Sequence, residues 1–223
     1  ANEMGILAGN IPDCKTTVEY CEFVNGGSTL NPGYQHNIYI NHIDTLVFRY
    51  NFTYDAIAQG HELKSRATYN FILYNRIANQ SSEDSRTIDL PNGGTSVVVG
   101  NIIEQGPNSA NNTFVNKKAT GSFIQIANGT EALFVKNNTF AGAKTGGLFI
   151  GSATVLDSSN NAINNSLDVF GFEDPSNHDY HLSSTSVLID AGTMISNYVH
   201  GYPLQPYLSY EDTCLYATRA ING

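Results

Sequence analysis

The sequence predicts an all-β fold, a right-handed parallel β-helix of roughly seven to eight coils with a C-terminal capping extension. An asparagine recurs once per predicted coil, a short apolar or aromatic run precedes it, and turn residues separate the runs. The recurring residues are Asn51, Asn75, Asn101, Asn138 and Asn161, and Cys21 fills the same position one coil earlier. Their intervals of 30, 24, 26, 37 and 23 residues suit one β-helix turn with loops of variable size.

Composition agrees with stacked strands and tight turns. Only 14% of the 223 residues are charged, whereas Asn and Gly, which take left-handed corners readily, are abundant. The formal net charge of -9 disfavours nucleic acid and anionic membrane surfaces as partners. No run of 18 apolar residues is present, so we expect no membrane insertion.

Each coil is expected to carry two main strand segments. The first series covers 36–41, 61–67, 86–92, 122–128 and 147–153, and the second series ends at the recurring asparagines. The stretch SNHDYHLSSTSVLIDAGT (176–193) resembles the closing segment of many bacterial β-helix proteins. We therefore expect a β-helix over 1–193 and a Tyr- and Pro-rich cap or tail over 194–223.

Strand alternation sorts the side chains of the first series into two faces. Apolar residues such as Ile38, Leu63, Ile88 and Ile124 are expected to face the core. The outward row is then predicted to contain Tyr39, Glu62 or Lys64, Asp89 and Gln125. A row that mixes a cation, carboxylates and an aromatic ring suits an acidic sugar polymer, which is the expected partner.

Further charged and polar residues surround this row. Arg66 and Arg86 are candidates to neutralise a carboxylate or to act as an acid, and His61 is expected to line the same groove. The alternative is that these residues have a structural role only. Lys64 would then form a surface ion pair with Asp89 or Glu62, and His36 and His61 would be turn residues hydrogen-bonded to the backbone.

The segment GHELKSRATYNFILYNRI (60–77) resembles part of polysaccharide lyase family six, which includes alginate lyases and chondroitinase B. The resemblance covers about one coil. It implies that Lys64, which precedes Ser65, is the base that removes the C5 proton of a uronic acid. A lysine acts as a base when a neighbouring cation lowers its pKa.

Two parts of the family pattern differ in this chain. Where the family has Arg-His-Gly, the chain has DLPNGG (89–94), so Arg86 is the nearest substitute for the proposed acid. The family also binds calcium through carboxylates before the lysine. Here only Asp55 and Glu62 are available, at different spacing, so the resemblance leaves Ca²⁺ as a possible cofactor.

Two functions remain open at this point. The first is a secreted or cell-surface polysaccharide lyase that cleaves a uronic-acid polymer by β-elimination. The alternative is a non-catalytic module that binds glycan, adheres or self-assembles end to end, because the first coil has no obvious polar cap. A disulfide between Cys14 and Cys21 and a structural role for Cys21 in the asparagine series are equally open, and Cys214 lies far from both.

Overall fold

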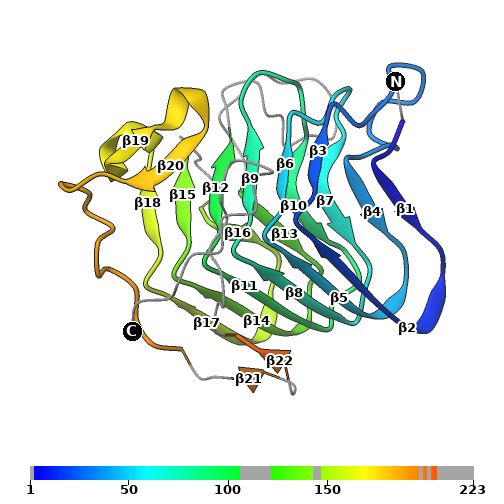
Figure 1. Ribbon diagram of the computed structural model, residues 1–223. Coiled ribbons are helices and arrows are strands. Elements are labelled where there is room, and N and C mark those ends of the chain that lie inside the picture. Colours follow the sequence, from blue (N-terminus) through cyan, green and yellow to red (C-terminus); the bar gives the residue numbers. More distant parts are fainter. Residues whose placement is uncertain (1–2, 106–121, 143–146, 196–197, 200–201, 205–223) are drawn as a thin grey trace.

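The computed structural model describes residues 3–105, 122–142, 147–195, 198–199 and 202–204. These residues form a parallel β-solenoid in which every coil, or layer, contributes one strand to each of three sheets (Figure 1). Sheet A contains β1 (Ile6–Ala8), β4 (Ile38–Ile40), β7 (His61–Ser65), β10 (Arg86–Leu90), β13 (Ile124–Ile126) and β16 (Phe149–Ile150). Sheet B contains β2 (Ile11–Glu19), β5 (Ile43–Arg49), β8 (Tyr69–Leu73), β11 (Thr95–Val99), β14 (Thr130–Lys136) and β17 (Ala153–Ser159). Sheet C contains β3 (Glu22–Val24), β6 (Phe52–Tyr54), β9 (Arg76–Asn79), β12 (Ile102–Gln105), β15 (Thr139–Ala141) and β18 (Ala162–Asn164).

The number of coils is smaller than predicted. Each sheet has six strands, so about five turns separate the first layer from the last, whereas seven to eight coils were expected. The chain leaves the solenoid after β18 ends at Asn164, and residues 167–182 form short 3-10 helices and a hairpin instead.

Each coil has three strands where two were predicted. The strands of sheet C follow the recurring asparagine directly and are only three or four residues long. Only two residues separate each of them from the preceding strand of sheet B, so no turn cluster marks a separate strand in the sequence. The two predicted series correspond to sheets A and B.

Aligned apolar rows fill the interior, as strand alternation predicts. In sheet A the in-register row Ile38, Leu63, Ile88 and Ile124 is fully buried. The same cluster includes Leu46 and other apolar residues of sheet B. Burial of these side chains supplies the main favourable term in the stability of the solenoid.

An asparagine ladder joins the six layers at the corner between sheets B and C. Oδ1 of each ladder asparagine accepts the backbone N–H of the ladder residue one layer earlier, at 2.9–3.1 Å. Nδ2 of the same side chain donates to a carbonyl oxygen of that earlier layer, at 2.8–2.9 Å. The ladder therefore satisfies backbone groups that a tight corner would otherwise leave buried and unpaired.

The residue before each ladder position has a left-handed backbone, with φ between 53° and 68°. The predicted residue types occur at Gly100, Asn137 and Asn160, but the first three corners carry tyrosines, Tyr20, Tyr50 and Tyr74. The tyrosine rings stack, with centroids 5.2 Å and 6.1 Å apart in successive layers. We infer that this stacking offsets the strain of a left-handed residue with a side chain.

Cys21 occupies the first ladder position, and its backbone N–H donates to Oδ1 of Asn51 at 3.0 Å. Cys14 and Cys21 are both free thiols, so the disulfide between them is not formed. Cys214 lies outside the described residues.

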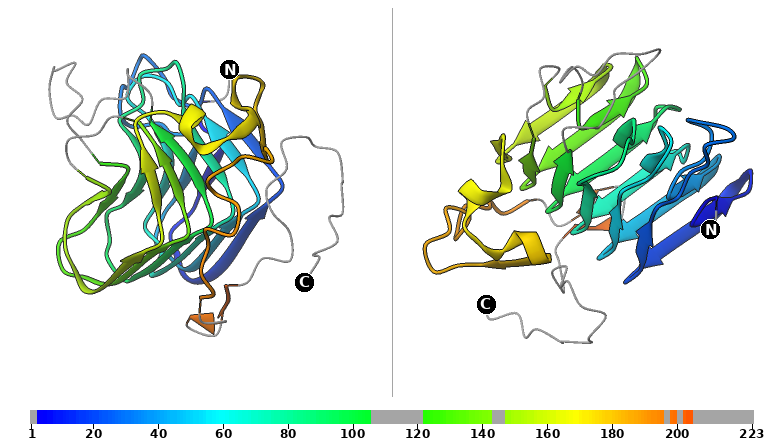
Figure 2. Two further views of the ribbon diagram at one scale, coloured as in Figure 1. Left: turned by 90° about the vertical axis from the view of Figure 1, so that its left-hand side faces the viewer. Right: turned by 90° about the horizontal axis from the view of Figure 1, so that it is seen from above.

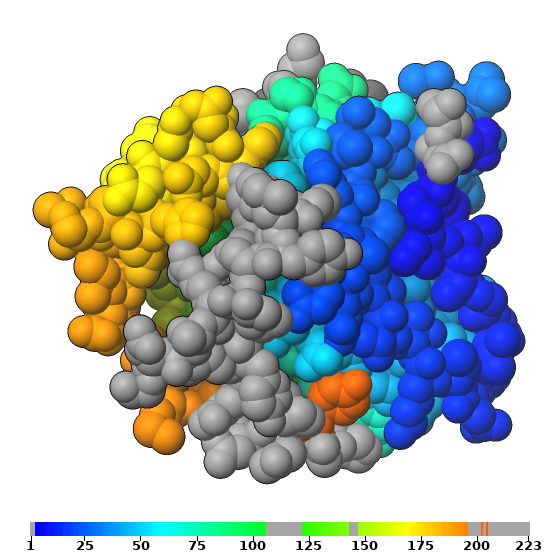
Figure 3. Space-filling model, in the orientation of Figure 1, coloured from blue at the N-terminus to red at the C-terminus, as the bar shows by residue number. Residues whose placement is uncertain are grey.

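Segments after the solenoid cover the outer face of sheet C. They comprise the 3-10 helices η1 (Leu167–Phe170) and η2 (Pro175–Asn177) and the antiparallel pair β19 (Phe172–Asp174) and β20 (Asp179–Leu182). The guanidinium of Arg76, a fully buried residue, lies 4.5 Å from the ring centroid of Tyr180. His178 packs edge-on against Phe52. In space-filling form this part, yellow to orange, forms one end of the molecule and the first layers form the other (Figure 3).

Part of the expected C-terminal cap packs against the outer face of sheet B. Phe71 and Tyr202 stack with centroids 4.4 Å apart, and the hydroxyl of Tyr74 donates to the carbonyl oxygen of Leu204 at 2.7 Å. The described strands of this part are β21 (Tyr198–Val199) and β22 (Tyr202–Pro203), which lie beside sheet B (Figure 2). Residues 205–223 lie outside the described part of the chain.

Candidate functional site

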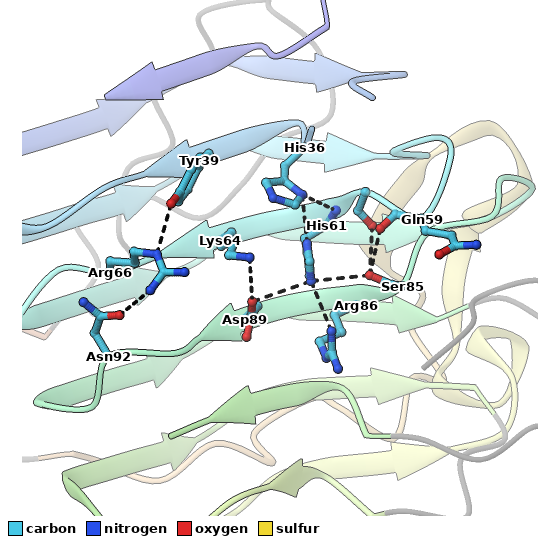
Figure 4. Close-up of polar contacts among 11 residues, drawn as sticks. His36, Tyr39, Gln59, His61, Lys64, Arg66, Ser85, Arg86, Asp89 and Asn92 are labelled. Atoms are coloured by element: carbon cyan, nitrogen blue, oxygen red, sulfur yellow. Dashed lines mark hydrogen bonds and ion pairs between the residues drawn. The ribbon is translucent and has the colours of Figure 1, made fainter. Parts of the chain in front are cut away.

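Parallel pairing in sheet A places one outward residue of each layer beside the next. The row runs Leu7, Tyr39, Lys64, Asp89, Gln125 and Ile150, each the register partner of its neighbours. The structure therefore aligns the four expected residues Tyr39, Lys64, Asp89 and Gln125 in the middle of the row. The side chains of its central part and their contacts are drawn in Figure 4.

Glu62 was expected to share the outward face of Lys64, and this expectation is wrong. Glu62 is fully buried, and its carboxyl oxygens accept from Ala56 N–H at 2.8 Å, from Asn37 Nδ2 at 2.5 Å and from Thr53 Oγ1 at 3.2 Å. Burial, and then the nearby Asp84, raise the pKa of Glu62 well above its usual value. Strict alternation fails at the start of β7, where the consecutive residues Glu62 and Leu63 are both fully buried.

His36 and His61 form a buried pair beside the row. Nδ1 of His36 accepts the backbone N–H of His61 at 3.0 Å, so this nitrogen carries a lone pair. The two Nδ1 atoms lie 2.8 Å apart, so the shared proton belongs to His61. In its neutral form, His61 therefore has Nε2 as an acceptor.

Both histidines are neutral near pH 7. Burial, with smaller contributions from Lys64 and Arg66, lowers the pKa of His36 to about 3. Burial, and then His36, Lys64 and Arg86, lower the pKa of His61 well below its usual value. The histidines consequently add hydrogen-bonding groups to the site and no charge.

Three cations lie around the row, each with a partner. Lys64 Nζ lies 3.5 Å from Asp89 Oδ2 and 5.7 Å from the ring centroid of Tyr39. Arg66 donates from Nε to the Tyr39 hydroxyl at 3.0 Å and from a terminal nitrogen to Asn92 Oδ1 at 2.7 Å. The expected ion pair between Lys64 and Asp89 is thus present, and the alternative pairing with Glu62 is absent because Glu62 is buried.

Arg86 lies on the same face, in register with His61. A terminal nitrogen of Arg86 lies 3.3 Å from His61 Nε2, and Ser85 Oγ lies 3.4 Å from the same nitrogen. Ser85 and Asn92 were not among the predicted site residues, because their approach depends on the path of the corners and not on strand alternation. His36 had been interpreted only as a turn residue.

The described residues offer no assembled metal site. Within the described ranges, no group of three or more His, Cys, Asp or Glu side chains is arranged to hold a metal ion. Asp55, one of the two carboxylates named for calcium, accepts instead from the backbone N–H groups of Gln80 and Ser81 at 2.7 Å and 3.0 Å. The other is the buried Glu62.

Comparison of the chain with protein-family models, with curated proteins and with solved structures finds no match. Among the described residues, no helix has the length and apolar character needed to cross a membrane.

Proposed function

We propose that this protein is a carbohydrate-active β-solenoid, secreted or at the cell surface, that binds an acidic polysaccharide on the outer face of sheet A. The observation that carries the proposal is local charge reversal. Three cations and one carboxylate lie on this face, in a protein whose formal net charge is -9: Lys64 pairs with Asp89, Arg66 contacts Tyr39, and Arg86 contacts His61. The neighbouring histidines are neutral, so the positive potential there comes from fixed cations and attracts an anionic polymer.

The arrangement of the three sheets supports this choice of face. The described C-terminal segments pack on the apolar outer faces of sheets B and C. The outward row of sheet A is polar at its centre and includes the ring of Tyr39, on which a sugar can stack. Strands stack about 4.8 Å apart, so the row offers regularly spaced contacts to an extended polymer.

A β-elimination step is the activity we propose for the bound polymer. Lys64 is the proposed base, and Arg66 and Arg86 are proposed to neutralise the uronate carboxylate or to serve as the acid. The supporting observation is that Lys64 lies in register between Tyr39 and Asp89, on the face that also presents both arginines. Neutralising the carboxylate acidifies the adjacent C–H and stabilises the enolate-like intermediate.

Affinity electrophoresis in gels containing alginate, pectate, dermatan, hyaluronan or ulvan tests the binding, with neutral dextran as the control polymer. Retardation by at least one acidic polymer and not by dextran is expected, and the Lys64→Ala, Arg66→Gln and Arg86→Gln variants should each be retarded less. Ultraviolet absorbance of unsaturated uronate, followed with and without calcium, reports cleavage. If no acidic polymer retards the protein, the proposed function is wrong. Binding without cleavage would show a glycan-binding module.

A second candidate function is end-to-end self-assembly. Leu156 and Ile163 continue the inward rows of Leu133 and Phe140 into the last layer, yet they are 49% and 55% exposed. Exposed apolar residues on an open sheet edge favour association. Sedimentation over a range of concentrations tests this candidate, and a monomer at every concentration would exclude it.

A further inference from the structure

Two polar atoms at the centre of sheet A are buried and have no hydrogen-bond partner. They are Oδ1 of Asp89 and Nε of Arg86, both carried by β10. The Asp89 side chain is only 5% exposed. Native proteins rarely leave buried polar groups unpaired, so each such group calls for a specific explanation.

The side chains that carry these atoms meet at one nitrogen. Arg86 approaches His61 Nε2 to 3.3 Å, and Asp89 Oδ2 lies 3.6 Å from the same nitrogen. Lys64 Nζ lies 3.5 Å from Asp89 Oδ2 (Figure 4). The four side chains therefore converge on one small region, although they come from two layers.

This cluster has a defined pattern of donors and acceptors. Arg86 and Lys64 supply positively charged donors, and Arg86 still has Nε to offer. Asp89 Oδ1 is an acceptor, and so is His61 Nε2, because His36 fixes the tautomer of His61. The cluster thus presents cationic donors and hydroxyl acceptors side by side.

Few chemical classes satisfy that pattern. A simple inorganic anion would be repelled by the Asp89 carboxylate. A metal cation or an amine would be repelled by the ammonium of Lys64 and the guanidinium of Arg86. A neutral sugar satisfies the acceptors but provides no counter-charge for the two cations. A sugar that carries both a carboxylate and free hydroxyls satisfies all of these groups at once.

We propose that His61, Lys64, Arg86 and Asp89 form a subsite for one uronic acid residue. In this subsite the carboxylate of the sugar accepts from Arg86, a sugar hydroxyl donates to Asp89 Oδ1, and Lys64 lies beside the sugar, where it is the proposed base. The inference rests on the proposed function and deepens it, because it names the residues that recognise a single sugar of the bound polymer.

Isothermal titration calorimetry with short probes tests the subsite. The probes are trigalacturonate and trimannuronate, each as the free acid and as the methyl ester, which removes the charge and adds one methyl group to each carboxylate. The wild type should bind at least one free acid about ten-fold or more tightly than its ester. Arg86→Gln should lose that preference, whereas Asp89→Ala should weaken the acid and the ester alike.

Two further variants serve as controls. Arg86→Lys keeps the charge but not the planar fork, so an intermediate affinity is expected. Arg49→Gln removes a cation that is paired with Glu19 on sheet B, and it should bind like the wild type. A thermal melt of each variant reports whether it is folded, and Arg86→Lys supplies the comparison if Arg86→Gln does not fold.

The outcomes separate this inference from the proposed function. If acidic polymers retard the protein in gels but the trimers do not bind, the subsite is overturned while the function stands. Equal affinity for acids and esters, or unchanged affinity in folded variants at positions 86 and 89, also overturns the subsite and leaves buried water as the partner of both atoms. If no acidic polymer binds, the proposed function itself fails.

Discussion

Glu62 places a carboxyl group in the interior of the solenoid, where three hydrogen bonds hold it. Its pKa is raised in the folded protein, chiefly by burial. A group of this kind contributes stability that is fully present below the pKa of the unfolded chain. That contribution is lost as the pH rises through the folded-state pKa.

The contribution of Glu62 to the free energy of unfolding should therefore fall as the pH rises from about 4.5, by at most about 1.4 kcal/mol per pH unit. The buried His36 and His61 act in the opposite direction below about pH 6.5, because their pKa values are lowered on folding, so the contribution of Glu62 is measured as a difference between variants. Glu62→Gln cannot ionise, so its free energy of unfolding should rise relative to that of the wild type as the pH rises over this range. Urea denaturation at a series of pH values measures both curves, with the exposed Glu173→Gln as control. Parallel curves for the wild type and Glu62→Gln would show that Glu62 is not the group responsible.

Gly100 shows how one corner depends on the layer beside it. It has a φ of 68°, and a Cβ atom there would lie 2.2 Å from the Tyr74 ring. Gly129 has a similar φ of 76°, but a Cβ atom there would have no neighbour within 4 Å. The pair separates the cost of a left-handed backbone from the cost of a steric clash.

Both Gly100→Ala and Gly129→Ala should lower the free energy of unfolding, because alanine is strained at either φ. The Gly100 variant should lose about 1–3 kcal/mol more, the usual cost of overpacking. Urea denaturation of the two variants gives the difference directly. Equal losses would mean that the Tyr74 ring moves aside at no cost.

Single residues were the hardest features to predict from the sequence. Lys64, Asp89 and Gln125 were correctly predicted to align in one row, although Asp89 is buried. Glu62 was misplaced because β7 departs from alternation at its start, where Glu62 and Leu63 are both fully buried. The contact between His36 and His61 depends on two corners in neighbouring layers, and no local pattern reports it.

At the scale of the elements, the asparagine ladder connects the layers. Asn101 illustrates its contribution, because Oδ1 accepts the backbone N–H of Asn75 and Nδ2 donates to the carbonyl oxygen of Ile72. All of these groups are buried. Loss of one ladder side chain therefore leaves backbone groups of neighbouring layers without partners.

Asn101→Ala should lower the free energy of unfolding by at least about 2 kcal/mol, since several buried groups lose their partners together. Asn161→Ala is the matched control, because Asn161 is in the last layer and its ladder contacts are partly exposed. Water can replace those contacts, so a smaller loss is expected. Similar losses at both positions would show that burial does not determine how much the ladder hydrogen bonds contribute to the free energy of unfolding.

The repeat also explains which elements were predictable. Sheet A was predicted because apolar residues alternate in its segments, as in Ile38–Ile40, and sheet B because the ladder asparagine marks the end of each strand. Sheet C was missed because only two residues separate each of its strands from the preceding strand of sheet B, so no turn cluster sets them apart in the sequence. The coil count was overestimated because the parallel strands end at Asn164, and Asp179–Leu182 pairs in an antiparallel hairpin.

For the whole molecule, the contrast between a negative net charge and a positive site predicts how binding depends on salt. The Lys64 side chain is 17% exposed, so its charge is partly screened by dissolved ions. The affinity for an acidic polysaccharide should therefore fall steadily as ionic strength rises. Calorimetry at several salt concentrations checks this, and Lys64→Ala should show a shallower dependence. An affinity that does not change with salt would show that charge attraction is not what holds the polymer.

The ladder also has a direction along the chain. Each asparagine brings its own side chain to groups of the layer before it: Asn51 accepts from the Cys21 N–H and donates to the Val18 carbonyl oxygen. Cys21 is the first ladder residue and only has to donate its backbone N–H to Asn51. A side-chain amide is therefore not needed at that position. During synthesis each new coil therefore emerges from the ribosome already carrying the group that fastens it to the coil already folded, so the solenoid can grow one turn at a time.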